Sequence, residues 1–151
     1  MTNVFDTLLA SRELTLKFIK GFTPAQLNHI PDGFNNNIIW NLGHLVVTQQ
    51  LLWYNLAGEK MHLSSEMVEK YKKGSQPSTI VTDDEIQKIK ELLTSLPKKS
   101  IADYKNKLFQ SYQEYTTSFN VTLRSIDDGI KFNNFHEGLH VGIIMALRKL
   151  V

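Results

Sequence analysis

The chain has 151 residues, of which 42% are hydrophobic and 21% charged, and we expect it to fold as a single domain spanning residues 1–151. It contains no cysteine, which excludes disulfides and thiolate metal ligands, so a metal would have to be bound by histidine, carboxylate or water. The formal net charge is only +2 and the basic residues are scattered, so the sequence offers no phosphate-binding stripe and we expect no nucleic-acid partner.

The first part of the chain predicts one long and one short helix. Apolar residues near 3–20 mostly follow the helical period, and Gly21 is a typical residue at which such a helix ends. Thr23 followed by Pro24 is typical of a helix start, because threonine caps the first turn and proline is tolerated at the first helical position.

A second long helix is predicted near residues 37–57, where apolar residues again follow the helical period and Gly58 ends the pattern. The following segment, 59–81, is long and polar. We expect it to be a crossover to the third long helix, with one helical turn around Ser65 to Tyr71.

A third long helix is predicted over residues 83–96. Thr82 and Glu85 have the spacing of a capping box, which opens a helix. Pro97 is expected to end it, because proline has no amide hydrogen and its ring collides with the preceding turn. A further short helix is expected around residues 101–108.

The last part of the chain predicts an ordered connection and a final helix. Residues 109–124 are rich in aromatic and hydroxyl side chains, and Ser125 with Asp128 caps a helix near 126–150. Strand signals are weak throughout. Four long helices with a long crossover between the second and third predict an all-α protein, a four-helix bundle.

The N-terminal segment bears on the compartment. Asp6 and Arg12 interrupt its apolar residues, and no apolar run in the chain approaches the length that spans a membrane. We therefore expect no signal peptide, no membrane anchor and no membrane partner. The protein is expected in the cytoplasm.

The most informative motif is His136-Glu137-Gly138-Leu139-His140, near the end of the predicted final helix. Two imidazoles four residues apart lie on the same helix face, so both can reach one metal ion. Both lie on the apolar face, where a polar ring needs a partner. The alternative is that each is a core histidine bonded to a backbone carbonyl or an asparagine. Because two such histidines occur together, we favour the metal site over two separate core histidines.

The third ligand must come from upstream of this motif. The same five letters are a signature of zinc peptidases, in which the glutamate is the general base, but those enzymes take their third ligand from downstream. Residues 141–151 contain no His, Cys, Asp or Glu, so the peptidase is the least favoured reading. His44, on the inward face of the second helix, is the natural third ligand. Three imidazoles without a fourth protein ligand leave an open position, which is typical of a catalytic site.

These residues resemble a known family. Asn41-Leu42-Gly43-His44, together with the stretch 136–142, is similar to the DinB-like superfamily of metal-binding helical proteins. The resemblance implies a four-helix bundle, typically a homodimer, with His44, His136 and His140 binding a divalent metal. Some members are transferases or isomerases that use a low-molecular-weight thiol bound at the metal, and many others have no established activity. All-imidazole ligation suits zinc, nickel or iron.

Five further residues are candidates for contacts to the ligands or to a substrate. Asn41 and Asn133 lie one turn before a ligand histidine, and the alternative is a buried amide bonded to backbone. Trp40, Tyr112 and Tyr115 could wall a pocket over the metal. Aromatic residues at helical spacing are more often core residues, and we favour that interpretation for Trp40.

Glu137 borders the metal-facing side of its helix, about 60° from His140. It could orient an imidazole or accept a proton, but we favour a surface charge near Arg124 or Lys131. Gly138 and Gly142, beside the histidine pair, predict a close-packing face, either within the bundle or in a dimer.

Two functions stay open. The first is a metal-dependent transferase or hydrolase that acts on a small molecule, with a thiol co-substrate supplied from outside because the chain has no cysteine. The second is a non-catalytic metal-binding or interaction module. The open three-histidine site favours the enzyme, but no second carboxylate or arginine cluster is evident, so the sequence does not decide whether this is an enzyme.

Overall fold

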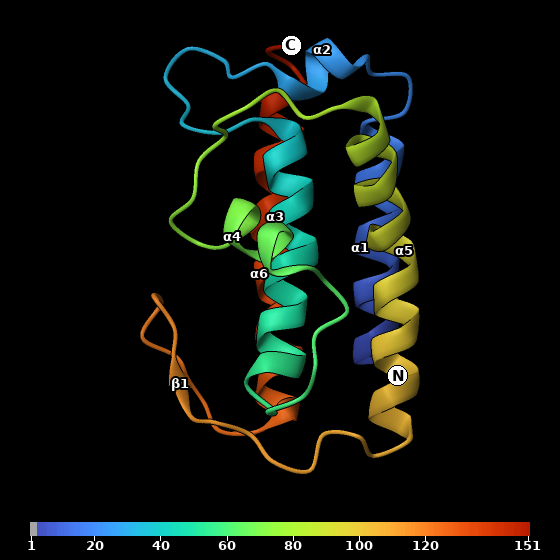
Figure 1. Ribbon diagram of the computed structural model, residues 1–151, viewed down its shortest axis with the longest axis vertical. Helices are drawn as coiled ribbons and strands as arrows, with labels where there is room; N and C mark the ends of the chain where they lie inside the picture. The colour runs from blue at the N-terminus through green and yellow to red at the C-terminus, as the bar shows by residue number, and fades with distance from the viewer. Residues whose placement is uncertain (1–2) are drawn as a thin grey trace.

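The computed structural model describes residues 3–151, and this part of the chain is mostly helical, as predicted (Figure 1). Four long helices lie along its long axis: α1 (Val4–Phe18), α3 (Ile38–Gln50), α5 (Asp83–Lys105) and α6 (Ile126–Leu147). The helix α3 continues directly into one π-helical segment, η1 (Leu51–Asn55). Two short helices and a small hairpin complete the described part: α2 (Pro24–Asn28), α4 (Ser65–Tyr71), β1 (Tyr115–Thr116) and β2 (Thr122–Leu123).

The helix starts follow the predicted caps. The side chain of Thr23 forms a capping box with Gln26 at the start of α2. The Thr82 hydroxyl accepts a hydrogen bond from the amide of the third residue of α5, and the Ser125 hydroxyl does the same for α6. Each cap satisfies an amide that the first helical turn leaves without a partner, so the three predicted helix starts are confirmed. The capping box predicted at Thr82 is only half formed, because the Glu85 carboxylate accepts hydrogen bonds from Lys70 and Tyr71 instead.

The predicted end of the third long helix at Pro97 is wrong. Helix α5 continues through Pro97 to Lys105 and absorbs the separate short helix expected around 101–108. An interior proline costs about 3 kcal/mol. Here the apolar face continues across it, since Leu93, Leu96 and Ile101 are at most 9% exposed. Burial of this face outweighs the local cost, which the sequence rule does not take into account.

The crossover between α3 and α5 packs tightly on α3. Its helix α4 falls at the predicted residues, and Tyr71 at its end is 1% exposed. A Cβ atom on Gly43 would lie 2.5 Å from the Tyr71 ring, so only glycine at this position lets the two segments approach so closely. The crossover is therefore fixed against the centre of α3.

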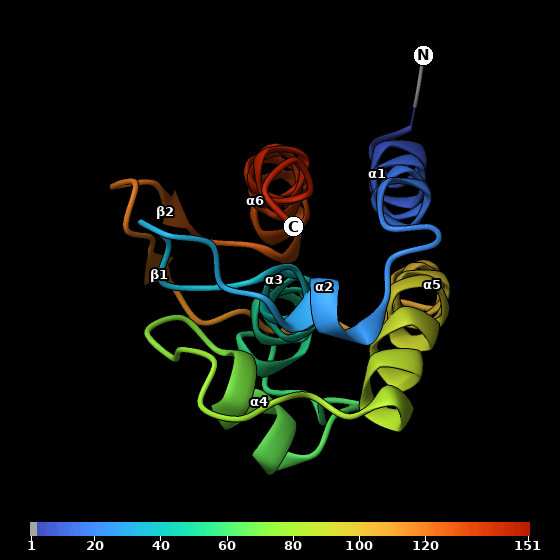
Figure 2. The ribbon, with the colours of Figure 1, turned by 90° about the horizontal axis from the view of Figure 1, so that it is seen from above.

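The connection 109–124 is ordered, as predicted, and carries the hairpin that the weak strand signals did not reveal. Tyr115 pairs with Leu123 and Thr116 with Thr122 in antiparallel register. Seen from above, the hairpin lies beside α3 and α6, on the side away from α1 and α5 (Figure 2). It thus borders the two helices that carry the histidines.

The exposed face of α6 does not pack on the rest of the described chain. A Cβ atom on Gly138 or Gly142 would meet no atom within 4 Å, so the prediction that these glycines pack closely within the bundle is wrong. Neighbouring apolar side chains on the same face, Phe135 and Met145, are 48% and 43% exposed. Among the helices of residues 3–151, none is long and apolar enough to cross a membrane.

Candidate metal centre

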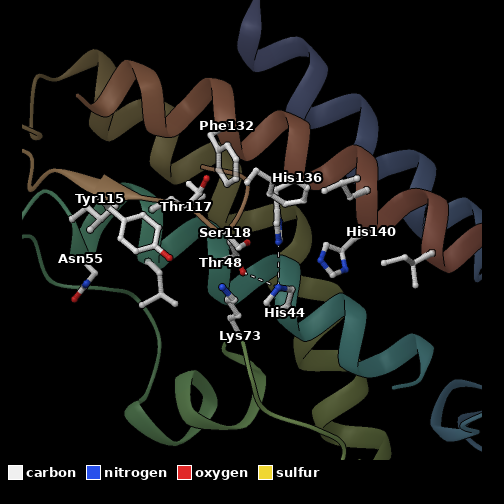
Figure 3. A pocket seen from close by; sticks show the side chains of 16 residues that line it. His44, Thr48, Asn55, Lys73, Tyr115, Thr117, Ser118, Phe132, His136 and His140 are labelled. Atoms are coloured by element: carbon white, nitrogen blue, oxygen red, sulfur yellow. Dashed lines mark hydrogen bonds between the residues drawn. The ribbon is translucent and has the colours of Figure 1, made fainter. Parts of the chain in front are cut away.

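Three histidines from two adjacent helices converge. His44 comes from the middle of α3, and His136 and His140 come from successive turns of α6 (Figure 3). One ring nitrogen of each lies within 4.8 Å of those of the other two. The Nε2 atoms of His44 and His136 are 3.2 Å apart. The predicted convergence of the three rings is confirmed.

The crossover fixes the orientation of the His44 ring. Its Nδ1 lies 2.7 Å from the carbonyl oxygen of Tyr71. A carbonyl oxygen can only accept, so Nδ1 must carry the proton and donate it. The lone pair is then on Nε2, the atom that faces the other two histidines. The close packing of Tyr71 on Gly43 thus sets the tautomer of the ring.

An asparagine fixes the His140 ring in the same way. The Nδ2 of Asn41 donates to the side-chain oxygen of Asn36 at 2.9 Å and to the carbonyl oxygen of Asn37 at 2.7 Å. Its Oδ1 is therefore the atom that faces His140 Nδ1, 2.8 Å away, and it must accept the proton of that nitrogen. The lone pair of His140 is again on Nε2.

The His136 ring is less constrained. Its Nε2 faces His44, and its Nδ1 is buried and has no hydrogen-bond partner within the described residues. Two Nε2 lone pairs 3.2 Å apart repel each other unless a cation or a proton lies between them. Two nitrogens bonded tetrahedrally to one metal at about 2.05 Å would be about 3.3 Å apart, so the donor set suits a divalent ion.

The electrostatic environment keeps the three rings neutral. Burial lowers the pKa of His136 to about 2, and the charge of Arg12 and any protonation of His140 or His44 act in the same direction. Burial also lowers the pKa of His140 to about 3 and that of His44 below its usual value. Since only the neutral ring is a ligand, the rings are ready to bind a metal at neutral pH.

The histidines lie at the edge of a cavity of about 620 Å³, within the size range of small-molecule sites. Apolar side chains dominate its lining. Those from η1 and α6 are Leu51, Leu52, Phe132, Leu139 and Ile143, and Leu56 directly follows η1. Tyr115 and Phe119 of the hairpin segment also line it. The polar lining residues are Thr48, Asn55, Lys73, Thr117 and Ser118, all labelled in Figure 3.

Thr48 was not identified from the sequence. Its hydroxyl lies 3.3 Å from Nε2 of His44, on the cavity side (Figure 3). The available signal is its spacing, because a residue four positions after a ligand lies on the same helix face. The hydroxyl can both donate and accept beside the three ring nitrogens.

The interpretation of Glu137 as a surface charge near Arg124 or Lys131 is wrong. Glu137 is 1% exposed, and its carboxylate accepts hydrogen bonds of 2.7 and 2.6 Å from Nε and an Nη of Arg12, which is also 1% exposed. Burial raises the pKa of Glu137, and the Arg12 guanidinium opposes this and favours the carboxylate. Periodicity placed Arg12 within helix α1 but did not reveal that the two buried charges would meet.

Two other candidates, Trp40 and Asn133, do not line the cavity. The Trp40 ring stacks on the His44 ring, with centroids 4.7 Å apart and planes 11° apart, while its Nε1 donates to Ser75. Asn133 is fully buried, and its Nδ2 donates weakly to Glu137 at 3.5 Å. Trp40 therefore contacts a ligand, and Asn133 contacts the buried ion pair.

The two tyrosine candidates differ in their relation to the cavity. Tyr115 lines the cavity. Tyr112 does not: its hydroxyl donates to the carbonyl oxygen of Leu52 at 2.9 Å and so fastens the connection to η1. Of the tyrosines proposed to wall the site, only Tyr115 is in a position to touch a ligand.

Comparison with known proteins agrees with this geometry. The family model described as the DinB superfamily matches residues 7–144, a stretch that contains all three histidines and the crossover. No curated protein matches the chain.

Proposed function

Because this chain belongs to the DinB superfamily, we propose that it binds one divalent metal ion through His44, His136 and His140. The fold in this proposal is a four-helix bundle of α1, α3, α5 and α6, with the long crossover between α3 and α5. One observation carries the proposal: neutral ring nitrogens, two of them with their tautomer set by other residues, converge at the edge of a small-molecule cavity. Zinc, nickel and iron suit such ligands.

We further propose that the protein is a metal-dependent transferase or hydrolase acting on a small molecule, with a low-molecular-weight thiol as co-substrate. When bound, the metal would act as a Lewis acid and lower the pKa of a coordinated thiol or water. Three protein ligands leave room for such a group. In this scheme the Thr48 hydroxyl orients the incoming group by a hydrogen bond, and the apolar lining excludes water from it.

The position of Glu137 argues against the zinc-peptidase reading of the same motif. In that chemistry the glutamate must reach the attacking water as a general base. Here its carboxylate is bonded to Arg12 between α6 and α1 and does not line the cavity. The alternative that stays open is a non-catalytic metal-binding or interaction module.

The test is metal analysis of untagged protein, followed by cobalt substitution and titration with a small thiol. We expect about one metal per chain in the parent and none retained tightly by His140→Ala, with the helical circular dichroism unchanged. His29→Ala is the matched control, because His29 is exposed and outside the site. A sulfur-to-cobalt charge-transfer band in the parent, absent from His140→Ala, supports the thiol. Bound metal without any thiol band leaves hydrolysis or plain metal binding.

We also propose a homodimer that buries the exposed face of α6. Phe135, Leu139 and Met145 on this face are 37–48% exposed, and Gly138 and Gly142 leave open space between them. Such a face allows a second helix to approach closely. Sedimentation at micromolar concentration should give a dimer, and Met145→Arg should give a monomer. A parent protein that sediments as a monomer refutes the proposal.

A further inference from the structure

The cavity combines an apolar wall with a single formal positive charge. We propose that its ligand is an apolar small molecule that ends in an anionic group, such as a carboxylate, and that Lys73 recognises this group. The inference rests on the proposed function in one respect: it assigns the same cavity as the substrate site. It goes further in naming the chemical class of the substrate.

The lining of the cavity suits an apolar ligand body. Six aliphatic or aromatic side chains from η1, the residue that follows it and α6 line the cavity: Leu51, Leu52, Leu56, Phe132, Leu139 and Ile143. On the hairpin side, Tyr115 and Phe119 also line it, although they are 41% and 52% exposed. An apolar ligand would remove these side chains from water, which favours its binding.

The charge of the lining suits a ligand with an anionic group. Among the residues that line the cavity, Lys73 is the one Lys or Arg, and there is no Asp or Glu. Its neighbour Lys72 is paired with Glu69 at 2.6 Å, whereas no ion pair of Lys73 occurs in the described part of the chain. A cationic ligand would therefore find no countercharge in this lining, while an anion would find one.

The placement of Lys73 favours a ligand with its charge and its apolar body at different places. The crossover brings this lysine to the cavity that His44 and Thr48 also line, and Figure 3 draws its side chain toward that cavity. Its backbone follows Tyr71, which is held against α3. An anionic end can therefore lie at Lys73 while the apolar body contacts Phe132 and Leu139 on α6.

The experiment is calorimetric titration of the full chain, first treated with EDTA, with octanoate, octanol and octylammonium at equal ionic strength. Octanoate should bind more tightly than octanol, and octylammonium most weakly. Lys73→Met should weaken the binding of octanoate about three- to fivefold, the size expected for one exposed charge pair. It should change the affinity for octanol by less than about twofold. Lys72→Met is the matched control and should leave both unchanged.

A second variant tests the sign of the charge without disturbing the core. Ser118 is exposed and lines the cavity, so Ser118→Asp adds the carboxylate that the lining lacks. This variant should bind octanoate more weakly and octylammonium more tightly than the parent does. Equal binding of octanoate and octanol, or equal effects of Lys73→Met and Lys72→Met, overturns the inference.

Repeating the titrations with zinc-treated parent and His140→Ala separates this inference from the proposed metal site. If the protein binds no zinc but its affinity for octanoate still depends on Lys73, the proposed function fails and the ligand class stands. If zinc binds but octanoate does not depend on Lys73, the ligand class fails and the metal site stands.

Discussion

The buried Arg12–Glu137 ion pair makes a strong prediction about stability. Replacing Arg12 by methionine removes the guanidinium and leaves a carboxylate that is 1% exposed without its countercharge. Breaking a buried pair from one side costs about 3–5 kcal/mol, a large part of the stability of a domain of this size. The same change also removes the hydrogen bond of 2.9 Å from Arg12 to the carbonyl oxygen of Leu45. We therefore expect Arg12→Met to lower the free energy of unfolding by at least about 3 kcal/mol.

The double variant Arg12→Met/Glu137→Leu separates the charge from the packing. It removes both charges and fills the space with apolar atoms, and such replacements are often neutral or stabilising. We expect it to recover most of the loss. The assay is urea unfolding of EDTA-treated protein at pH 7, followed by circular dichroism. A loss below about 1 kcal/mol for Arg12→Met, or a double variant no more stable than the single one, refutes this account of the pair.

The pH dependence of Arg12→Met provides an independent check. Without the guanidinium, burial is opposed only by the 3.5 Å hydrogen bonds from Ser11 and Asn133, and it raises the pKa of Glu137 in the folded state above the unfolded value. The folded variant then binds a proton at a pH where the unfolded chain does not. The difference in stability between parent and variant should therefore shrink as the pH falls from 8 to 5. A difference that grows over this range contradicts the assignment of the cost to a buried carboxylate.

Two further predictions concern the histidines. Because burial lowers the pKa of His136 to about 2 and that of His140 to about 3, the unfolded chain takes up protons below its own histidine pKa of about 6.5 and the folded chain does not. In metal-free protein, these rings should not change the free energy of unfolding above pH 7. Below about pH 6 each ring should lower it by about 1 kcal/mol per pH unit, measured by urea unfolding in EDTA. A free energy of unfolding that stays level from pH 7 to 4.5 refutes this prediction. Asn41→Ala removes the acceptor of His140 Nδ1 and should weaken zinc binding about 10- to 100-fold by competition with a chelating dye, whereas Asn36→Ala, which changes only the outer contact of that amide, should have a smaller effect.

The sequence predicted the candidate metal ligands more successfully than the residues that orient those ligands. The pair His136 and His140 follows from helical spacing, and His44 follows from its inward position on α3. Of the partners that set the tautomers, Asn41 was a candidate from its position one turn before His44, but the ring that it contacts, His140, depends on tertiary packing. The other partner is a backbone carbonyl, that of Tyr71, which no side-chain pattern can reveal.

The errors at Pro97 and Glu137 have one physical origin. Both predictions applied a local rule, that proline ends helices and that a lone glutamate is solvated. In both cases a long-range contact outweighs the rule: burial of the α5 face across Pro97, and the guanidinium that α1 brings to Glu137. The helix caps were predicted correctly because their hydrogen bonds join residues three positions apart and need no tertiary contact.

The crossover between α3 and α5 is part of the site as well as a connection. It supplies the carbonyl oxygen of Tyr71 that orients His44, and two residues later it supplies Lys73 to the cavity. Both depend on one close contact, because any side chain at Gly43 would displace the Tyr71 ring. A displacement of the crossover would therefore change the metal ligand and the charged end of the cavity together. Because α3 and α5 both run from the top to the bottom of Figure 1, the connection must return along the length of the helices, and this coupling gives a physical reason for its being ordered.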